Sequence, residues 1–246
     1  MRRLPRGKQG GNTAQQAKKD GPLIELESVG YSYGRSTPLL SDLTVKLAPG
    51  SFHFLTGPSG AGKTTFLKLC YLELTPTSGR VRIFGHSGSD LGRDHVALSR
   101  QKIGVVHQDC RFLDHLSLAE NIALPLTVSK RPVPQNDLSD LMAWVGLTQQ
   151  ADQLPPELSG GERQRAALAR AVMTGPDVLL ADEPTGNVDW EMSLRLLHLM
   201  VELNRMGKTV LIATHDMALI RASRQYVQAR VLRLQGGRLT LAGADL

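Results

Sequence analysis

The chain has 246 residues, of which 41% are apolar and 21% charged, and it contains 24 Gly and 13 Pro. This length allows one folded domain with a sizeable core, and the composition excludes fibrous and low-complexity proteins. The formal net charge of +6 is concentrated in residues 1–22, where six Lys and Arg side chains accompany one Asp. The rest of the chain is nearly neutral and shows no basic face, so we expect no nucleic-acid partner.

Residues 1–22 contain one Leu and no aromatic residue, which predicts a disordered basic tail. The tail lacks the apolar stretch of a secretory signal, and a solvated extension or a misplaced start codon is favoured over a membrane-surface anchor. Only two cysteines occur, Cys70 and Cys110, which is typical of a reducing compartment. No run of about 18 apolar residues is present. We therefore expect a cytoplasmic protein that does not itself span a bilayer.

From residue 23 onward, short apolar runs rich in β-branched residues alternate with helical patterns, which predicts an α/β fold with a largely parallel sheet. The predicted strands are residues 23–26, 51–56, 81–84, 103–106, 178–181 and 210–213, and residues 226–234 and 238–241 form a predicted hairpin. Residues from about 109 to 173 show helical periodicity interrupted by prolines. We therefore expect a helical subdomain of about residues 109–173, inserted in a single domain of residues 23–246.

Residues 57–64 match the pattern G-x-x-x-x-G-K-[ST] at every defined position, between a predicted strand and a helical run. Glycines allow successive backbone N–H groups to converge on a phosphate, and the helix dipole favours the anion. Lys63 is expected to bridge two phosphates, and the Thr64 hydroxyl to bind Mg²⁺. A Gly-rich turn before a helix is the alternative, but it does not require the full motif. The predicted nucleotide-binding residues are Gly57, Pro58, Ser59, Gly60, Ala61, Gly62, Lys63, Thr64 and Thr65.

Two adjacent carboxylates, Asp182 and Glu183, follow the predicted strand of residues 178–181. Ligands of α/β sheets bind at the carboxyl ends of strands. Asp182 is expected to hold Mg²⁺ through a water molecule, and Glu183 to act as the general base that orients the attacking water. In isolation the pair would be a solvated strand end, but the phosphate-binding motif favours the functional interpretation.

A second helix start lies at residues 158–162, with the sequence Leu-Ser-Gly-Gly-Glu. Ser159 and Glu162 have the spacing of a capping box that opens a helix predicted over residues 163–173. Gly160 and Gly161 each cost a helix about 1 kcal/mol relative to alanine. Glycines in the first turn allow a close approach of another group, and a helix N-terminus can bind an anion.

The order of these motifs resembles that of the ATP-binding cassette ATPases, whose signature matches Leu158, Ser159, Gly160, Gly161 and Glu162. The resemblance covers residues 23 to about 240. It implies a P-loop NTPase fold with a mostly parallel core, an antiparallel β part and a helical signature subdomain. It also implies an enzyme that hydrolyses ATP with Mg²⁺. In this family two subunits form a dimer in which each signature covers the γ-phosphate bound by the partner's phosphate loop.

The resemblance gives roles to further residues. Tyr33, in preference to Tyr31, matches the aromatic residue that stacks on adenine. Gln108 matches a glutamine that contacts Mg²⁺ or the attacking water and reports to a membrane partner. Without the resemblance the tyrosines would be interpreted as packing residues.

Three more residues match the family by position. Asn187 and Asp189 match the loop that crosses the dimer interface, although Asp189 could equally be a plain N-cap of a helix over residues 190–204. His215 matches the histidine that contacts the γ-phosphate. An isolated histidine at a strand end is more often structural, so its role depends on the order of the motifs.

Within the family, residues 54–63, 108–114, 121–126 and 180–187 resemble the bacterial cell-division ATP-binding proteins. This resemblance implies an FtsX-like integral membrane partner, control of peptidoglycan hydrolases, and a peripheral location on the cytoplasmic face of the inner membrane at the division site. The energy subunit of a lipoprotein-releasing or other substrate-moving transporter remains the alternative. A soluble switch protein acting on ribosomes or nucleic acid is disfavoured. So is an importer with a C-terminal regulatory domain, because the chain ends at Leu246.

Three positions depart from the family pattern: His107 replaces an aromatic residue, Leu72 a glycine and Val188 a leucine. A partner groove is expected near residues 112–128, between the Gln108 loop and the helical insertion. The apolar candidates there could instead form the core of the insertion; they are Leu113, Leu116, Leu118, Ile122 and Leu124.

Overall fold

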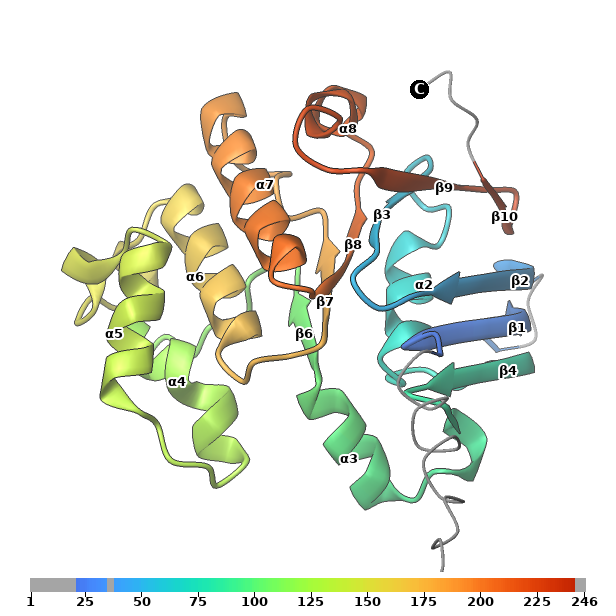
Figure 1. Ribbon diagram of the computed structural model, residues 1–246, viewed down its shortest axis with the longest axis horizontal. Helices are drawn as coiled ribbons and strands as arrows, with labels where there is room; N and C mark the ends of the chain where they lie inside the picture. Colours follow the sequence, from blue (N-terminus) through green and yellow to red (C-terminus); the bar gives the residue numbers. More distant parts are fainter. Residues whose placement is uncertain (1–20, 35–37, 242–246) are drawn as a thin grey trace, which may run out of the picture.

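A computed structural model describes residues 21–34 and 38–241. The predicted basic tail falls almost entirely on residues 1–20, which lie outside the described residues, as do residues 35–37 and 242–246. Figure 1 shows a smaller sheet at one end, a central sheet, and a group of helices at the other end.

The smaller sheet is antiparallel and has the strand order β2-β1-β4-β5. Its strands are β1 (Ile24–Tyr31), β2 (Leu40–Leu47), β4 (Ser78–Ile83) and β5 (His86–Ser87). Sequence reasoning missed β2. Asp42 has a left-handed φ of 52°, and the pairing of β1 with β2 shifts register twice, so the regular alternation that marks a strand is broken.

The central sheet has the strand order β10-β9-β3-β8-β7-β6. Its strands are β3 (Phe52–Thr56), β6 (Ile103–Val106), β7 (Val178–Asp182), β8 (Thr209–Ala213), β9 (Ala229–Gln235) and β10 (Arg238–Leu241). All neighbours are parallel except β9 and β10, which form the predicted hairpin through Gly236 and Gly237. Every residue of β3, β7 and β8 is buried, as expected for a parallel sheet covered on both faces.

The helices are α2 (Lys63–Cys70), α3 (Arg93–Gln101), α4 (Leu118–Val128), α5 (Gln135–Trp144), α6 (Gly160–Val172), α7 (Trp190–Arg205) and α8 (Met217–Ser223). Short 3₁₀ turns occur at Gly88–Asp90, Thr148–Gln150 and Pro155–Glu157. Between β6 and β7 the chain forms α4, α5 and α6 and no strand. No helix within residues 21–34 and 38–241 is both long and apolar enough to cross a membrane.

Three apolar clusters hold the fold together. The first lies between the two sheets and includes the fully buried Phe66 of α2. The second covers the other face of the central sheet with α6, α7 and α8. The third joins α4, α5 and α6, and it contains Leu118 and Ile122, both with no exposed surface. Leu118 and Ile122, two of the apolar candidates for a partner surface, therefore belong to the core of the insertion.

Candidate functional site

The phosphate-binding motif forms the connection from β3 to α2, as predicted. Gly60 and Gly62 have left-handed φ values of 77° and 101°, which glycine adopts without strain. A Cβ atom on Gly57 would lie 2.3 Å from the carbonyl oxygen of Leu234. The N-terminus of α2 has no side-chain cap, so backbone N–H groups of its first turn are available to an anion. Pro58, Ser59 and Ala61 complete this loop.

Lys63 is the first residue of α2, and its side chain is almost fully buried. Its Nζ atom donates to the carbonyl oxygen of Gly57 at 3.0 Å and to that of Pro58 at 3.4 Å. The same atom lies 3.4 Å from Oε1 of Glu183, which follows β7. The ammonium group of Lys63 therefore contacts both the phosphate loop and the predicted general base.

Glu183 and His215 also lie together. Nδ1 of His215 is 2.9 Å from Oε1 of Glu183, and the Glu183 side chain is only 12% exposed, compared with 71% for His215. Glu183 has a left-handed φ of 45°, and its N–H donates to the carbonyl oxygen of Ala213 at 2.8 Å. Strand β8 ends at Ala213, as predicted, so His215 stands two residues beyond the end of the strand.

Asp182 ends β7 with 7% of its surface exposed, and its Oδ1 atom has no hydrogen-bond partner. Burial raises the pKa of this carboxyl group, and a hydrogen bond from the Thr64 side chain opposes the shift. A cavity of about 80 Å³ brings Asp182, Thr64 and Gln108 to one place. Gln108 lies two residues beyond β6, which ends at Val106.

These oxygen-bearing groups fit Mg²⁺, which takes hard oxygen ligands and retains water. The unpartnered Asp182 oxygen is available to accept a hydrogen bond from a water molecule bound to the metal. No cluster of three or more His, Cys, Asp or Glu that could hold a metal occurs in the described part of the chain. In the usual arrangement, Mg²⁺ takes nucleotide phosphates and water beside one or two protein oxygens.

Tyr33 packs edge-on against Tyr31, with ring centroids 4.9 Å apart, and 53% of its surface is exposed. Its hydroxyl group lies 3.1 Å from Oγ1 of Thr65, a buried residue in the first turn of α2. An exposed aromatic face therefore stands beside the helix that begins at the phosphate loop.

The signature segment starts α6. Oγ of Ser159 accepts from the N–H of Glu162 at 3.3 Å, and Oε2 of Glu162 accepts from the N–H of Ser159 at 2.8 Å, which confirms the capping box. The helix begins at Gly160, three residues before the predicted start, so both glycines are helical. Leu158 is buried, whereas Ser159 and Gly160 are exposed at the helix tip.

The tip of α6 packs on the turn that follows Glu183. A Cβ atom on Gly160 would lie 3.3 Å from the carbonyl oxygen of Asn187, and one on Gly161 would lie 3.2 Å from Cε of Met192. Asp189 caps α7, because its Oδ1 accepts from the N–H of Met192 at 2.8 Å. The N-cap interpretation of Asp189 is therefore confirmed.

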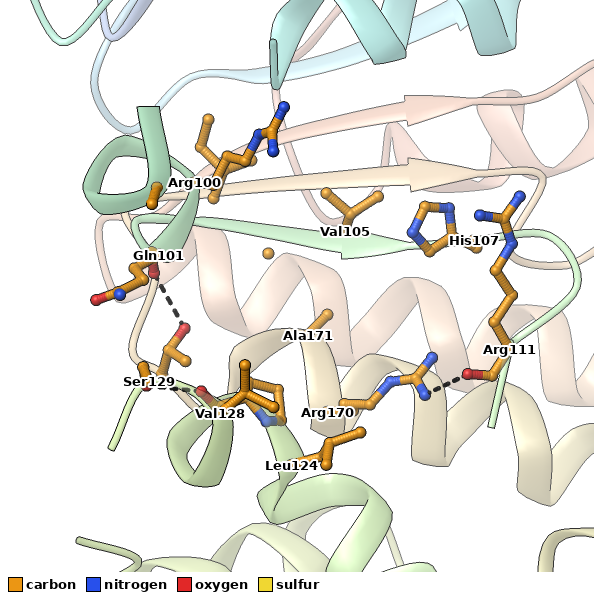
Figure 2. Close-up of a pocket in the computed structure, with 15 residues that line it drawn as sticks. Arg100, Gln101, Val105, His107, Arg111, Leu124, Val128, Ser129, Arg170 and Ala171 are labelled. Carbon is orange, nitrogen blue, oxygen red and sulfur yellow. Dashed lines mark hydrogen bonds between the residues drawn. The ribbon is translucent and has the colours of Figure 1, made fainter. Parts of the chain in front are cut away.

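A groove of about 670 Å³ is lined by residues of α3, β6, α4 and α6 (Figure 2). Of the predicted stretch, only Leu124, Pro125 and Val128 line it, because Leu118 and Ile122 point into the core. Sequence reasoning noted His107 only as a departure from the family pattern, and it missed the three arginines of the groove, which carry no motif: Arg100, Arg111 and Arg170. None of the described residues that line the groove is acidic.

Comparisons with known proteins agree with this geometry. The ABC transporter family model matches residues 40–186. The chain is 46% identical over 220 residues to the cell division ATP-binding protein FtsE of Mycobacterium tuberculosis, covering 88% of this chain and 94% of the relative. It is 41% identical to FtsE of Escherichia coli K12, covering 88% and 97%. A dimeric structure of the ATP-binding cassette MJ0796 in a post-hydrolysis state, bound to ADP and Pi, has a TM-score of 0.79 at 31% identity and covers 88% and 96%. From its motifs, its fold and these relatives, the chain belongs to the ABC transporter family and is an ATPase of the cassette type.

Proposed function

We propose that two copies of this chain bind ATP and Mg²⁺ between them and power a membrane complex of bacterial cell division. The observation that carries the proposal is the half-site at the sheet edge, where Lys63, Glu183 and His215 meet at one carboxylate oxygen. The exposed tip of α6 supplies the complementary half for a partner copy. The FtsE relatives and the dimeric cassette structure support this arrangement.

In the proposed reaction, the loop N–H groups and Lys63 hold the β- and γ-phosphates of ATP, and Tyr33 stacks on adenine. Thr65 supports Tyr33 through their hydroxyl contact. Lys63 exchanges its bonds to the Gly57 and Pro58 carbonyl groups for bonds to phosphate. The ammonium group is already desolvated, so this exchange costs little reorganisation.

Glu183 is the proposed general base. Its carboxylate accepts a proton from water as the water oxygen attacks the γ-phosphorus. The bond between the γ-phosphorus and the oxygen that bridges it to the β-phosphate breaks, and ADP leaves. His215 orients Glu183 in the resting state and contacts the γ-phosphate when ATP is bound. Mg²⁺, held by Thr64 and, through water, by Asp182 with Gln108 beside it, would neutralise phosphate charge.

The partner copy is proposed to place Ser159 and Gly160 against the γ-phosphate, where the N-terminus of α6 favours an anion. Leu158 and Glu162 fix this tip, one by burial and the other by the capping box. Asn187 and Asp189 lie beside the tip and are proposed to face the other protomer. Within this scheme, residues of about 109–173 act as a helical subdomain of a domain spanning residues 23–246.

The groove is the proposed docking site of an FtsX-like integral membrane protein, which would place this chain on the cytoplasmic face of the inner membrane at the division site. Its apolar wall includes Val105, Leu124 and Val128, and its basic side chains lack acidic neighbours in the groove. These features fit a short amphipathic helix that carries carboxylates. Through that partner, ATP turnover is proposed to control peptidoglycan hydrolases.

Depletion of the protein, with parent and Lys63→Ala copies supplied in trans, tests the proposal. Filamentous cells that the parent restores and Lys63→Ala does not, together with co-purification of a membrane protein without lipoprotein cargo, would support it. Normal division on depletion would overturn the division role. Co-purification of a lipoprotein or solute carrier system would favour the transporter alternative.

A further inference from the structure

The loop that follows β6 holds two residues in an unusual conformation. Cys110 and Arg111 have left-handed φ values of 55° and 45°, and neither is glycine. Such residues are sterically disfavoured, and two in succession persist only when the surroundings hold them. The loop turns tightly at these residues. The N–H of Cys110 donates to the carbonyl oxygen of His107 at 3.1 Å, and the N–H of Arg111 donates to the carbonyl oxygen of Asp109 at 2.5 Å.

The group that holds them comes from α6. Nη1 of Arg170 donates to the carbonyl oxygen of Arg111 at 2.8 Å (Figure 2). Nη2 of the same side chain donates to the carbonyl oxygen of Cys110. The guanidinium group also stacks over the Phe112 ring, 4.5 Å from its centroid. A planar fork of N–H donors is suited to two neighbouring carbonyl oxygens, whereas a lysine ammonium group is not.

No carboxylate of the described residues forms an ion pair with Arg170. Burial lowers the pKa of this guanidinium group. Its contacts are the two carbonyl dipoles and the face of the Phe112 ring, and these stabilise its charge. A partly buried cation without an acidic partner is costly unless its hydrogen bonds are made. Arg170 and the loop carbonyls therefore depend on each other.

The same loop lies between the two cavities of the proposed function. His107 and Arg111 line both the 670 Å³ groove and the 80 Å³ cavity that contains Thr64, Gln108 and Asp182. A second side chain of α6, Gln164, donates to the carbonyl oxygen of Gln108 at 3.4 Å. Helix α6 thus holds the loop at both its beginning and its strained middle.

We propose that Arg170 is a positioning residue that clamps the residue 108–111 loop to the signature helix, so that the partner groove and Gln108 move as one unit. The clamp extends the proposed function, because it explains how occupation of the groove reaches the nucleotide. It also ties Gln108 to the helix whose tip is Ser159. The role of Arg170 is indirect, because its guanidinium group holds carbonyl groups of the loop.

The two cysteines of the chain provide a test that needs no added probe site. Cys110 lies in the clamped loop and is 6% exposed, whereas Cys70 lies in the core with no exposed surface. We expect Arg170→Ala to accelerate labelling of the Cys110 thiol by Ellman's reagent about tenfold, because hydrogen bonds from a charged donor are lost. Labelling of Cys70, which requires global unfolding, should keep its parent rate.

Arg165→Ala is the matched control. Arg165 lies on the same helix and also donates to two successive carbonyl oxygens, those of Val145 and Gly146, but these belong to the end of α5. The control should leave Cys110 labelling at the parent rate. If Arg170→Ala fails to fold, Arg170→Lys carries the same test, because lysine keeps the charge without the fork.

A second readout concerns the metal. Arg170→Ala should raise the Mg²⁺ concentration needed for half-maximal ATPase activity several-fold, while binding of a fluorescent ATP analogue without Mg²⁺ stays at the parent affinity. Unchanged Cys110 labelling, or equal acceleration at Cys70, would overturn the clamp. The labelling needs neither ATP nor a membrane partner, so its result is independent of whether the division role holds.

Discussion

Replacing Asp182 by asparagine should stabilise the nucleotide-free protein while removing its Mg²⁺-dependent activity. Asp182 is 7% exposed, and its Oδ1 atom has no partner. Burial is the largest cause of its raised pKa, followed by the opposing hydrogen bond from Thr64 and the repulsion of Glu183. The ionised carboxylate is therefore unfavourable when no metal ion is bound, whereas asparagine keeps the shape and removes the charge.

An unsatisfied buried acceptor costs about 1–3 kcal/mol, and a neutral amide costs less than a charge in the same place. For a domain of this size, 1 kcal/mol corresponds to about 2–4 °C in Tm. We therefore expect Asp182→Asn to raise the Tm of the nucleotide-free protein by roughly 2–12 °C at pH 7. Without the carboxylate for the metal, ATP hydrolysis should fall at least about a hundredfold.

The pH dependence follows from the direction of the shift. Because the folded state raises the pKa of Asp182, it binds this proton more tightly than the unfolded chain does. The penalty is absent below the pKa of an unfolded aspartate, about 3.9, and reaches its full size above the raised pKa of the folded state. The Tm advantage of Asp182→Asn should therefore shrink as the pH falls.

The assay is thermal unfolding in EDTA between about pH 3.5 and about 8, with hydrolysis measured separately in Mg²⁺. Asp177→Asn is the control, because Asp177 is exposed just before the opposite end of β7 and its replacement should change stability by no more than about 0.5 kcal/mol. An Asp182→Asn protein that melts below the parent at pH 7 would refute the reasoning about the buried carboxylate. Parent-level hydrolysis would refute the metal role.

Three further predictions concern the base and the core. Glu183→Gln should lower ATP turnover by about 10²–10⁴-fold and leave an ATP-bound dimer that survives gel filtration, and turnover at the parent rate would contradict the base assignment. Leu118→Ala should lower the free energy of unfolding in urea by about 2–5 kcal/mol, since Leu118 has no exposed surface; an unchanged midpoint would remove it from the core. Gly104→Ala places a Cβ atom 2.2 Å from the carbonyl oxygen of Ala171, so α6 must move away from β6. The free energy of unfolding in urea should fall by about 1–3 kcal/mol, and a midpoint equal to that of the parent would contradict this prediction.

The parts of the site that sequence reasoning located are those carried by contiguous residues. The phosphate loop, the pair Asp182 and Glu183, and the capping box of Ser159 with Glu162 each depend on local spacing and on a neighbouring strand or helix. Helix α3 was missed because only Ser99 of it is buried, so no apolar stripe marks its periodicity. A helix is recognised in the sequence by the spacing of its buried apolar residues, and α3 has almost no such residues.

The clamp of Arg170 could not be found in the same way. Its two carbonyl partners precede it by 59 and 60 residues, and no spacing rule links an arginine within a helix to a loop so far away. The left-handed residues Cys110 and Arg111 are also unmarked, because sequence signals for that conformation depend on glycine or asparagine. Tertiary contact supplies what the local sequence disfavours at these positions.

Helix α6 connects the two ends of the proposed mechanism. At its N-terminus, Gly160 and Gly161 pack against Asn187 and Met192, which follow the Glu183 strand end. Toward its C-terminus, Arg170 holds the Gln108 loop, about 15 Å along the helix axis at 1.5 Å per residue. Both glycines therefore pack closely within one protomer, independently of any contact with nucleotide on a partner. Since a helix transmits displacement along its axis with little bending, a shift of the groove wall at Arg170 should reach the Ser159 tip and the Glu183 turn together.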